Sequence, residues 1–208
     1  MKNKEMKKYG FIYLVFSFLL FLNWTYGQGL NAEQLKQHPL FTSFAQVDTL
    51  PAEEVLRLSF KRKLPADFNE KIMKYSNLQE LHLKSMRLKA VPHAVWSLRN
   101  LTVLDISNNK LSVLSDSLGE LQELERLIIN RNDIPQLPKQ IANLVHLQYI
   151  DMFSTLIIDF PEEISTLRNT LKTIDMRIIA MNDAQKLQLQ SYLPDTKFLF
   201  SNSCNCKQ

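Results

Sequence analysis

A histidine, an aspartate and a serine stand at spacings that could bring them together. His82 and Asp105 are 23 residues apart, and Ser107 follows Asp105 by two. Such a trio could form a nucleophile and its base. The sequence shows no sign of a base that would hold the serine hydroxyl, and no G-x-S-x-G or Gly-rich phosphate loop. We therefore predict that the chain is not an enzyme and binds no cofactor.

Two aspartates, Asp151 and Asp175, occupy equivalent places one repeat apart. Carboxylates on neighbouring strands would lie ~5 Å apart, where they would repel, raise one pKa or hold a cation. The alternative is an ordinary exposed face on which nearby Arg177 offsets the charge. We favour the alternative and predict no metal site.

The two cysteines, Cys204 and Cys206, stand near the end of the sequence. A disulfide between residues two apart is geometrically awkward, and two cysteines alone cannot make a structural zinc site. Two alternatives remain open: free thiols, or a disulfide to another chain, which an oxidising compartment would favour.

The elements that must position these residues follow from a repeat. Leu78, Leu101, Leu124 and Leu147 recur every 23 residues, and Leu171 follows after 24. When each is counted as position 1, apolar residues recur at positions 4 and 6, and in the full repeats also at 11, 14, 18 and 21. A period of 20–50 residues indicates a stacked architecture.

The spacing also predicts the shape of one coil. Positions 4 and 6 alternate, so both point to the same side of a short strand. The return segment carries its own apolar residues inward, and no coil can bury its apolar side alone, so neighbours stack and share a core. The return side is bulkier than the strand side, so we expect five or six parallel strands lining a concave face.

The motif L-x-x-L-x-L-x-x-N-x-L occurs as LTVLDISNNKL (101–111) and LERLIINRNDI (124–134). It resembles the leucine-rich repeat family over about residues 53–181. The second half, as in LPKQIANLVH, is similar to 23-residue Ras-suppressor-type repeats and to bacterial secreted repeat proteins. The resemblance implies an α/β solenoid with short parallel strands on the concave face, an irregular or helical convex side, and helical caps.

Position 9 of the motif should order the turn that leaves each strand. An asparagine there can bond main-chain groups that would otherwise be buried unpaired. Asn109 and Asn132 occupy it, whereas Met86, Thr155 and Ile179 replace it. We predict weaker turn order in those three repeats.

Side chains at positions 2, 3, 5, 7 and 8 should point outward on the concave face. Aromatic residues and arginines are enriched at interface hot spots, and exposed Tyr149 and Phe153 beside Ile128 would form an apolar patch with a charged rim. The alternative is a solvated face, or one that abuts a cap. We predict that a protein or peptide ligand binds this face through Arg126, Ile128, Asn130, Arg131, Tyr149, Asp151, Phe153 and Arg177.

The two ends need caps because a solenoid exposes an apolar cross-section. Residues 28–52 predict an N-terminal helical cap, with Thr42 or Ser43 as N-cap. Residues 182–208 predict a C-terminal cap and tail, with a helix starting at Asn182 or Asp183 and a closing strand at 197–201. The predicted core contacts are Phe44, Val47 and Leu50 in the first cap, and Leu187, Leu189 and Leu193 in the second.

Residues 1–27 show the three-part pattern of a secretory signal peptide. Four lysines precede twelve uncharged residues, 11–22, and small residues follow at Thr25 and Gly27. We expect cleavage near Gly27, a secreted or periplasmic protein, and no stable membrane span afterwards; a short uncleaved anchor is the alternative.

Cleavage would also change the charge balance. It removes four of the 25 Lys/Arg and one of the 21 Asp/Glu, which leaves 21 against 20. That near-neutral chain gives no reason to expect nucleic acid or an anionic membrane as partner. We therefore predict an exported protein–protein interaction module. The alternative is an envelope structural protein that self-associates, with a disulfide through Cys204 or Cys206, and has no specific soluble ligand.

Overall fold

The computed structural model describes residues 30–201, in two compact units divided after His38. In the first unit, α2 (Ala32–Lys36) is one short helix. Its N-cap Asn31 accepts hydrogen bonds from main-chain N–H groups of the first turn, and the side-chain oxygen of Gln34 accepts one from the main-chain N–H of Asn31. This capping box satisfies donors that a helix start leaves unpaired.

Several sequence predictions fall outside the described residues. The predicted signal peptide, residues 1–27, is one, and the cysteine pair Cys204 and Cys206 is another. These interpretations stay predictions. Within residues 30–201, no helix is both long enough and apolar enough to cross a membrane.

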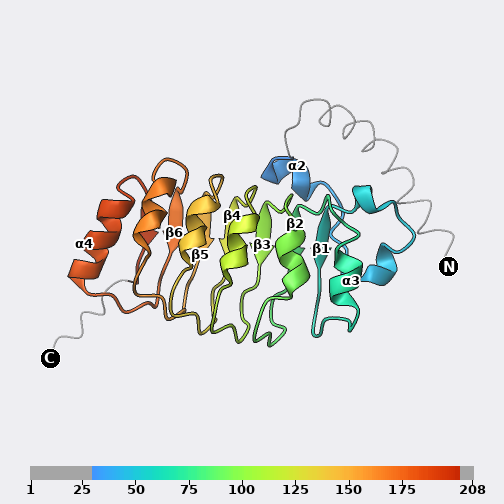
Figure 1. The fold of residues 1–208 in the computed structure, drawn as a ribbon, viewed down its shortest axis with the longest axis horizontal. Helices are drawn as coiled ribbons and strands as arrows, with labels where there is room; N and C mark the ends of the chain where they lie inside the picture. Colours follow the sequence, from blue (N-terminus) through green and yellow to red (C-terminus); the bar gives the residue numbers. More distant parts are fainter. Residues whose placement is uncertain (1–29, 202–208) are drawn as a thin grey trace. The chain divides into compact units, whose positions relative to one another are not determined.

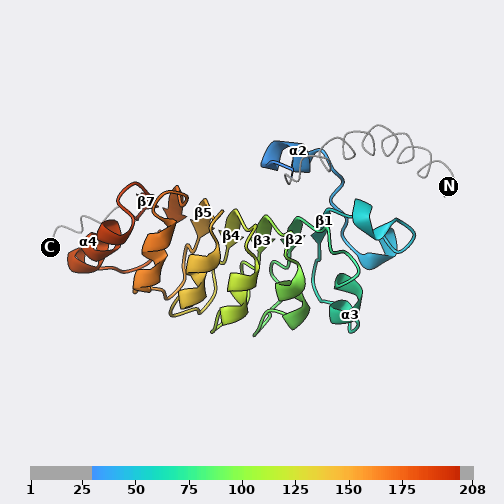
Figure 2. The ribbon, with the colours of Figure 1, turned by 45° about the horizontal axis from the view of Figure 1, so that its top comes forward.

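One sheet runs through the whole second unit. Its seven strands are all parallel and follow one another in chain order, and Figures 1 and 2 show them along one side of the unit with the helical segments on the other. The predicted α/β solenoid is therefore confirmed. The strands are β1 (Arg57–Ser59), β2 (Glu80–His82), β3 (Val103–Asp105), β4 (Arg126–Ile128), β5 (Tyr149–Asp151), β6 (Thr173–Asp175) and β7 (Lys197–Leu199).

The strand register follows the sequence repeat. Paired residues are 23 apart from β1 to β5, as in Arg57 opposite Glu80, and 24 apart between β5 and β6. Every strand is three residues long, so each coil contributes only one inward side chain from within its strand. The stack has six repeat strands, and the predicted closing strand joins the same sheet as the seventh.

Short helices form the return side of the coils. Proline directly precedes η2, η3, η5 and η6, as Pro51, Pro92, Pro138 and Pro161, and Ser115 takes that place before η4, where its hydroxyl accepts a hydrogen bond from the N–H of Ser117. Fixed φ at proline and side-chain capping at serine both favour a helix start. The helical segments are η1 (Phe44–Gln46), η2 (Ala52–Glu54), α3 (Phe68–Ile72), η3 (His93–Ser97), η4 (Asp116–Glu120), η5 (Lys139–Asn143), η6 (Glu162–Leu167) and α4 (Asp183–Tyr192).

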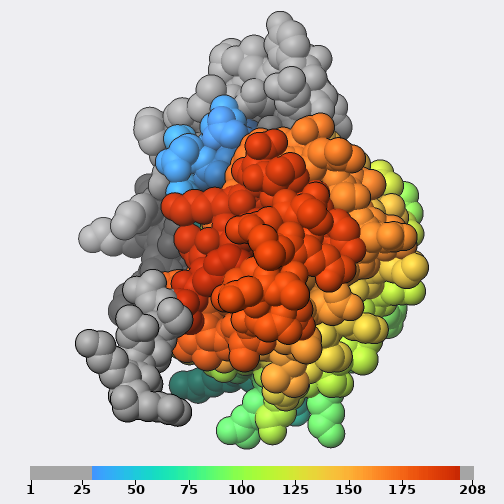
Figure 3. All heavy atoms as spheres, turned by 90° about the vertical axis from the view of Figure 1, so that its left-hand side faces the viewer, coloured from blue at the N-terminus to red at the C-terminus, as the bar shows by residue number. Residues whose placement is uncertain are grey.

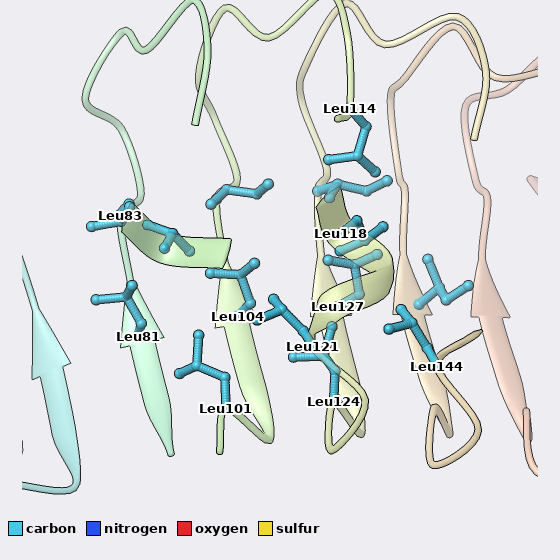
Figure 4. Packing of buried hydrophobic residues seen from close by; sticks show 14 of the residues in the cluster. Leu81, Leu83, Leu101, Leu104, Leu114, Leu118, Leu121, Leu124, Leu127 and Leu144 are labelled. Carbon is cyan, nitrogen blue, oxygen red and sulfur yellow. The ribbon is translucent and has the colours of Figure 1, made fainter. Parts of the chain in front are cut away.

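The core is one continuous ladder of aliphatic side chains between the two sides. Leu104 and Leu127 project from neighbouring strands and meet Leu118 and Leu121 of the return segment (Figure 4), and all four are fully buried. Burial of one leucine stabilises the fold by about 1.5–3 kcal/mol. The ladder therefore holds the strands, and the side chains on their outer face, in fixed register.

The strand-exit turns repeat one conformation. Position 8 has a positive φ in all six repeats, including Ser85, Ser154 and Ile178, whose repeats lack Asn at position 9. Asn109 explains part of this: its Oδ1 accepts from the N–H of Met86, so it orders the turn before its own. The prediction of weaker turns without Asn is thus wrong for the turn of Met86. The neighbouring coil supplies the missing amide.

The N-terminal edge of the sheet is covered within the second unit. Phe41 pairs with β1 through main-chain hydrogen bonds to Arg57 and Ser59, and the Phe44 ring packs edge-on against Phe60 at 5.0 Å. The predicted cap helix from residues 42–43 to Leu50 is wrong. Only the single turn η1 forms, because a polar turn and then Pro51 follow, and the residue before proline disfavours helix.

The C-terminal end carries α4 and β7, as predicted, and Figure 3 shows this end with the red C-terminal residues spread over it. Asn182 is the N-cap, and Leu189 and Leu193 are buried. Leu187 is 66% exposed, so its predicted core role is wrong. Residues two apart lie on opposite sides of a helix, so Leu187 cannot share the face of Leu189.

Candidate functional site

The outer side chains of the strands form one surface, which we call the strand face. It consists of positions 3 and 5 within β1–β7 and of positions 7 and 8 in the turn that follows each of β1–β6. Because successive strand residues point to opposite sides, the buried leucines at positions 4 and 6 force these side chains outward. Neighbouring coils then place equivalent residues about 4.8 Å apart.

The N-terminal half of the strand face is an ion-pair network. Arg57 Nε donates to Glu80 Oε2 at 2.7 Å and its Nη2 donates to Glu80 Oε1 at 3.1 Å. The His82 ring contacts Glu80 Oε1 through Nε2 at 2.5 Å and Asp105 Oδ2 through Nδ1 at 3.3 Å. Two cations and two carboxylates therefore alternate across β1, β2 and β3.

The network fixes the protonation of its members. Burial alone would lower the pKa of His82, but hydrogen bonds to Asp105 and Glu80 raise it to about 9. Burial would raise the pKa of Glu80, and bonds from His82 and Arg57 lower it to about 2. At neutral pH the imidazole is thus a cation with both nitrogens donating.

The protonated state of His82 argues against a catalytic role for His82, Asp105 and Ser107. An imidazolium cannot accept a proton, so His82 cannot act as a general base near neutral pH. Ser107 is 1% exposed, and its main-chain N–H donates to Asp105 Oδ1 at 2.9 Å. The three residues lie close together as the spacing suggested, but their contacts stabilise the strand and its exit turn.

The sequence did not indicate Arg57 and Glu80 as partners. Their signal was present: both are position-3 residues, 23 apart and opposite in charge. Comparing side chains one period apart would have paired them, because strand register equals the repeat period.

The middle of the strand face gathers aromatic rings and guanidinium groups. The Arg126 guanidinium lies 4.4 Å from the centre of the Tyr149 ring, and Arg131 and Arg177 each lie 5.7 Å from the centre of the Phe153 ring. Both rings are partly exposed. Stacking of this kind holds arginine side chains in place by cation–π attraction.

Carboxylates separate the two aromatic contacts. Asp151 Oδ2 accepts from Asn130 Nδ2 at 2.6 Å, and Oδ1 accepts from the main-chain N–H of Phe153 at 3.1 Å. Asp175 accepts from Arg177 at 3.0 and 2.7 Å, which lowers the pKa of Asp175. Arg177 thus offsets the negative charge of Asp175, as expected, whereas Asp151 accepts a hydrogen bond from the neutral amide of Asn130.

The same aspartate pattern recurs along the face. Asp105, Asp151 and Asp175 each accept from the N–H two residues later. These carboxylates close the exit turns, which gives position 5 a structural role. Within residues 30–201, no cluster of three or more His, Cys, Asp or Glu side chains could hold a metal ion.

The eight predicted binding residues occupy β4, β5 and the turns that follow β4, β5 and β6. Ile128 and Tyr149 are half-buried. Burial is the main reason why the pKa of Tyr149 is raised, and the negative charges of Asp151 and Asp175 add to the effect. Arg126 lies at the start of its strand and Arg131 beyond its end. The set therefore forms a band along the strand direction rather than one spot.

The repeat and its register match a known family. A family model described as "Leucine-rich repeat region" matches residues 38–193. The chain belongs to the leucine-rich repeat family. Leucine-rich repeat domains typically mediate protein–protein interaction and are typically non-enzymatic. A comparison with curated proteins gave no match.

Three solved leucine-rich repeat structures share the fold. A leucine-rich repeat protein of Leptospira interrogans is 22% identical over 78% of this chain and 54% of its own, with a TM-score of 0.59. An internalin of Listeria monocytogenes is 19% identical over 72% and 42%, with a TM-score of 0.57. A plant peptide hormone receptor, solved in complex with RGF2, is 21% identical over 69% and 23%, with a TM-score of 0.51. This chain thus spans about half or less of their lengths.

Proposed function

We propose that this protein is an exported binding module that holds a protein or peptide ligand on its strand face. The observation that carries the proposal is the band of Tyr149 and Phe153 stacked with arginines on a rigid sheet. Rigid aromatic and arginine side chains lose little entropy when a partner binds, which is why they dominate interface energetics.

Two further observations support the proposal. Members of the family commonly bind proteins, and the plant receptor was solved with RGF2 bound. The strand partners 23 residues apart support assignment of the repeats to the Ras-suppressor type that bacterial secreted proteins share. Export itself rests on the signal pattern of residues 1–27, and N-terminal sequencing of the protein from its source, starting after Gly27, would establish it.

The test of ligand binding is a cross-linked pull-down from the native source. A triple variant, Arg126→Ala, Tyr149→Ala and Phe153→Ala, should lose the partners that the natural protein retains. The matched control, Arg99→Ala with Val145→Ala, changes exposed residues outside the strands and should retain them. Equal partner lists for the natural protein and a folded triple variant would overturn the proposal.

A further inference from the structure

Two arginines of the strand face have no acidic partner. Arg177 is paired with Asp175 at 2.7 Å, but within residues 30–201 no carboxylate forms an ion pair with Arg126 or Arg131. Both guanidinium groups are exposed and lie over aromatic rings. Their charge is therefore held in place without being neutralised.

The nearby acid, Asp151, forms no ion pair with Arg126 or Arg131 within residues 30–201. Both oxygens of Asp151 already accept hydrogen bonds, from Asn130 and from the N–H of Phe153. A guanidinium that lies over a ring still offers N–H groups at its edge, and these match a carboxylate in bidentate geometry. The unused donors of Arg126 and Arg131 therefore favour a carboxylate from outside the chain.

The other half of the strand face provides the contrast. There Arg57 and protonated His82 share Glu80 and Asp105, so each charge has an internal partner. A uniformly charged face would attract anions without selectivity. The band differs in that Arg126 and Arg131, which form no ion pair within residues 30–201, lie over its partly exposed aromatic rings.

The spacing of the two arginines sets the length of what they bind. They stand five residues apart, at position 3 and position 8 of one coil. Five residues of extended chain span about 16 Å at about 3.3 Å per residue, and the turn at Arg131, which has a positive φ, makes the main-chain separation shorter than that. An extended peptide covers that distance with four or five residues. Between them the floor is made by Ile128, Tyr149 and Phe153, with the Asp151 carboxylate held among them by Asn130 and the N–H of Phe153.

We propose that the ligand is an extended acidic peptide segment, with two carboxylates four or five residues apart that bind Arg126 and Arg131. Apolar side chains between them pack on the aromatic residues of the band. This inference rests on the proposed function, because it names the chemistry of the ligand that the strand face would take.

Two labelled peptide pools test the selection of acid. Both contain 12-residue peptides of Val, Ile, Thr and Ser; one has Glu at positions 4 and 8, and the other has Gln there. By fluorescence anisotropy, we expect the Glu pool to bind at least about tenfold more tightly, as a charge-assisted bond of about 1.4 kcal/mol implies. The preference should weaken as salt rises.

The variants separate this site from general charge. Arg126→Gln with Arg131→Gln should bring the Glu and Gln pools within about twofold of each other, while circular dichroism stays unchanged. Arg99→Gln removes one exposed arginine outside the strands and should leave the preference intact.

Each other result overturns the inference. If the two pools bind equally, acid selection is wrong, yet peptide binding by the strand face stands. If neither pool binds, the acidic-peptide assignment is also wrong, and the pull-down described above decides separately whether the strand face has a protein ligand.

Discussion

Replacement of His82 by glutamine should destabilise the protein in a way that depends on pH. Its ring contacts both Glu80 and Asp105, and its side chain is only 23% exposed. The ordinary pKa of 6.5 is raised to about 9 in the fold. One pKa unit corresponds to about 1.4 kcal/mol, so the full effect is about 3 kcal/mol. Partial exposure reduces it, and we expect about 2 kcal/mol at pH 6.

The direction with pH follows from proton linkage. A raised histidine pKa stabilises the fold fully below pH 6.5, and this contribution is lost as pH rises through about 9. Glu80 acts in the opposite sense: its pKa is lowered to about 2, so its contribution is present above pH 4.5 and lost as pH falls toward 2. The network therefore stabilises most between about pH 4.5 and 6.5.

Urea unfolding of the natural protein and His82→Gln at pH 6, 7.5 and 10 measures the effect. The loss of about 2 kcal/mol at pH 6 should shrink to about 0.5 kcal/mol or less at pH 10, where His82 is as uncharged as the glutamine that replaces it. His146→Gln, at an exposed residue, should change the free energy of unfolding by under about 0.5 kcal/mol throughout. A loss that is equal at pH 6 and 10, or an NMR titration of His82 near pH 6.5, would refute the reasoning.

Three more substitutions, and Leu187→Ala as a control for the third, test how the coils stack, each measured by urea unfolding. Gly119→Ala would place a Cβ 2.8 Å from Gln140 Cβ on the next coil, so we expect a loss of about 1–3 kcal/mol from overpacking; unchanged stability would show that the coils can separate there. Asn109→Ala leaves buried main-chain groups of two coils unpaired, and should cost about 2–4 kcal/mol, whereas a loss below 1 kcal/mol would mean that water replaces the amide. Leu189→Ala should cost about 2–4 kcal/mol and Leu187→Ala almost nothing; equal losses would contradict the observed orientation of α4.

The repeat made the fold predictable because one spacing determines both the strand register and the core. The period of 23 residues appears in space as Arg57 opposite Glu80 and Arg126 opposite Tyr149. The structure of the two ends was harder to predict from the sequence, because no repeat constrains it. The helix expected up to Leu50 depended on one apolar spacing, and local turn chemistry ended it after one turn.

The candidate site was predictable in position but not in pairing. Sequence placed the arginines and aromatic residues on one face, but which guanidinium groups are neutralised depends on side-chain geometry. Arg177 and Arg131 contact the same ring at the same distance, yet only Arg177 bonds a carboxylate. The repeat assigns Arg131 to position 8 and Arg177 to position 7, but the spacing alone does not show which of the two bonds a carboxylate.

The division between used and unused side chains distinguishes structure from function on this face. His82, Asp105 and Ser107 have the residue types of a catalytic site, but every contact the structure gives them stabilises their own coils. Arg126 and Arg131 suggest no reaction, and no ion pair within residues 30–201 uses their charge. A buried charge without a partner would be costly, but an exposed one fixed over a ring is tolerated and remains available to a ligand. Loss of the first group should therefore lower stability with little effect on ligand binding, and loss of the second should weaken binding with little effect on stability.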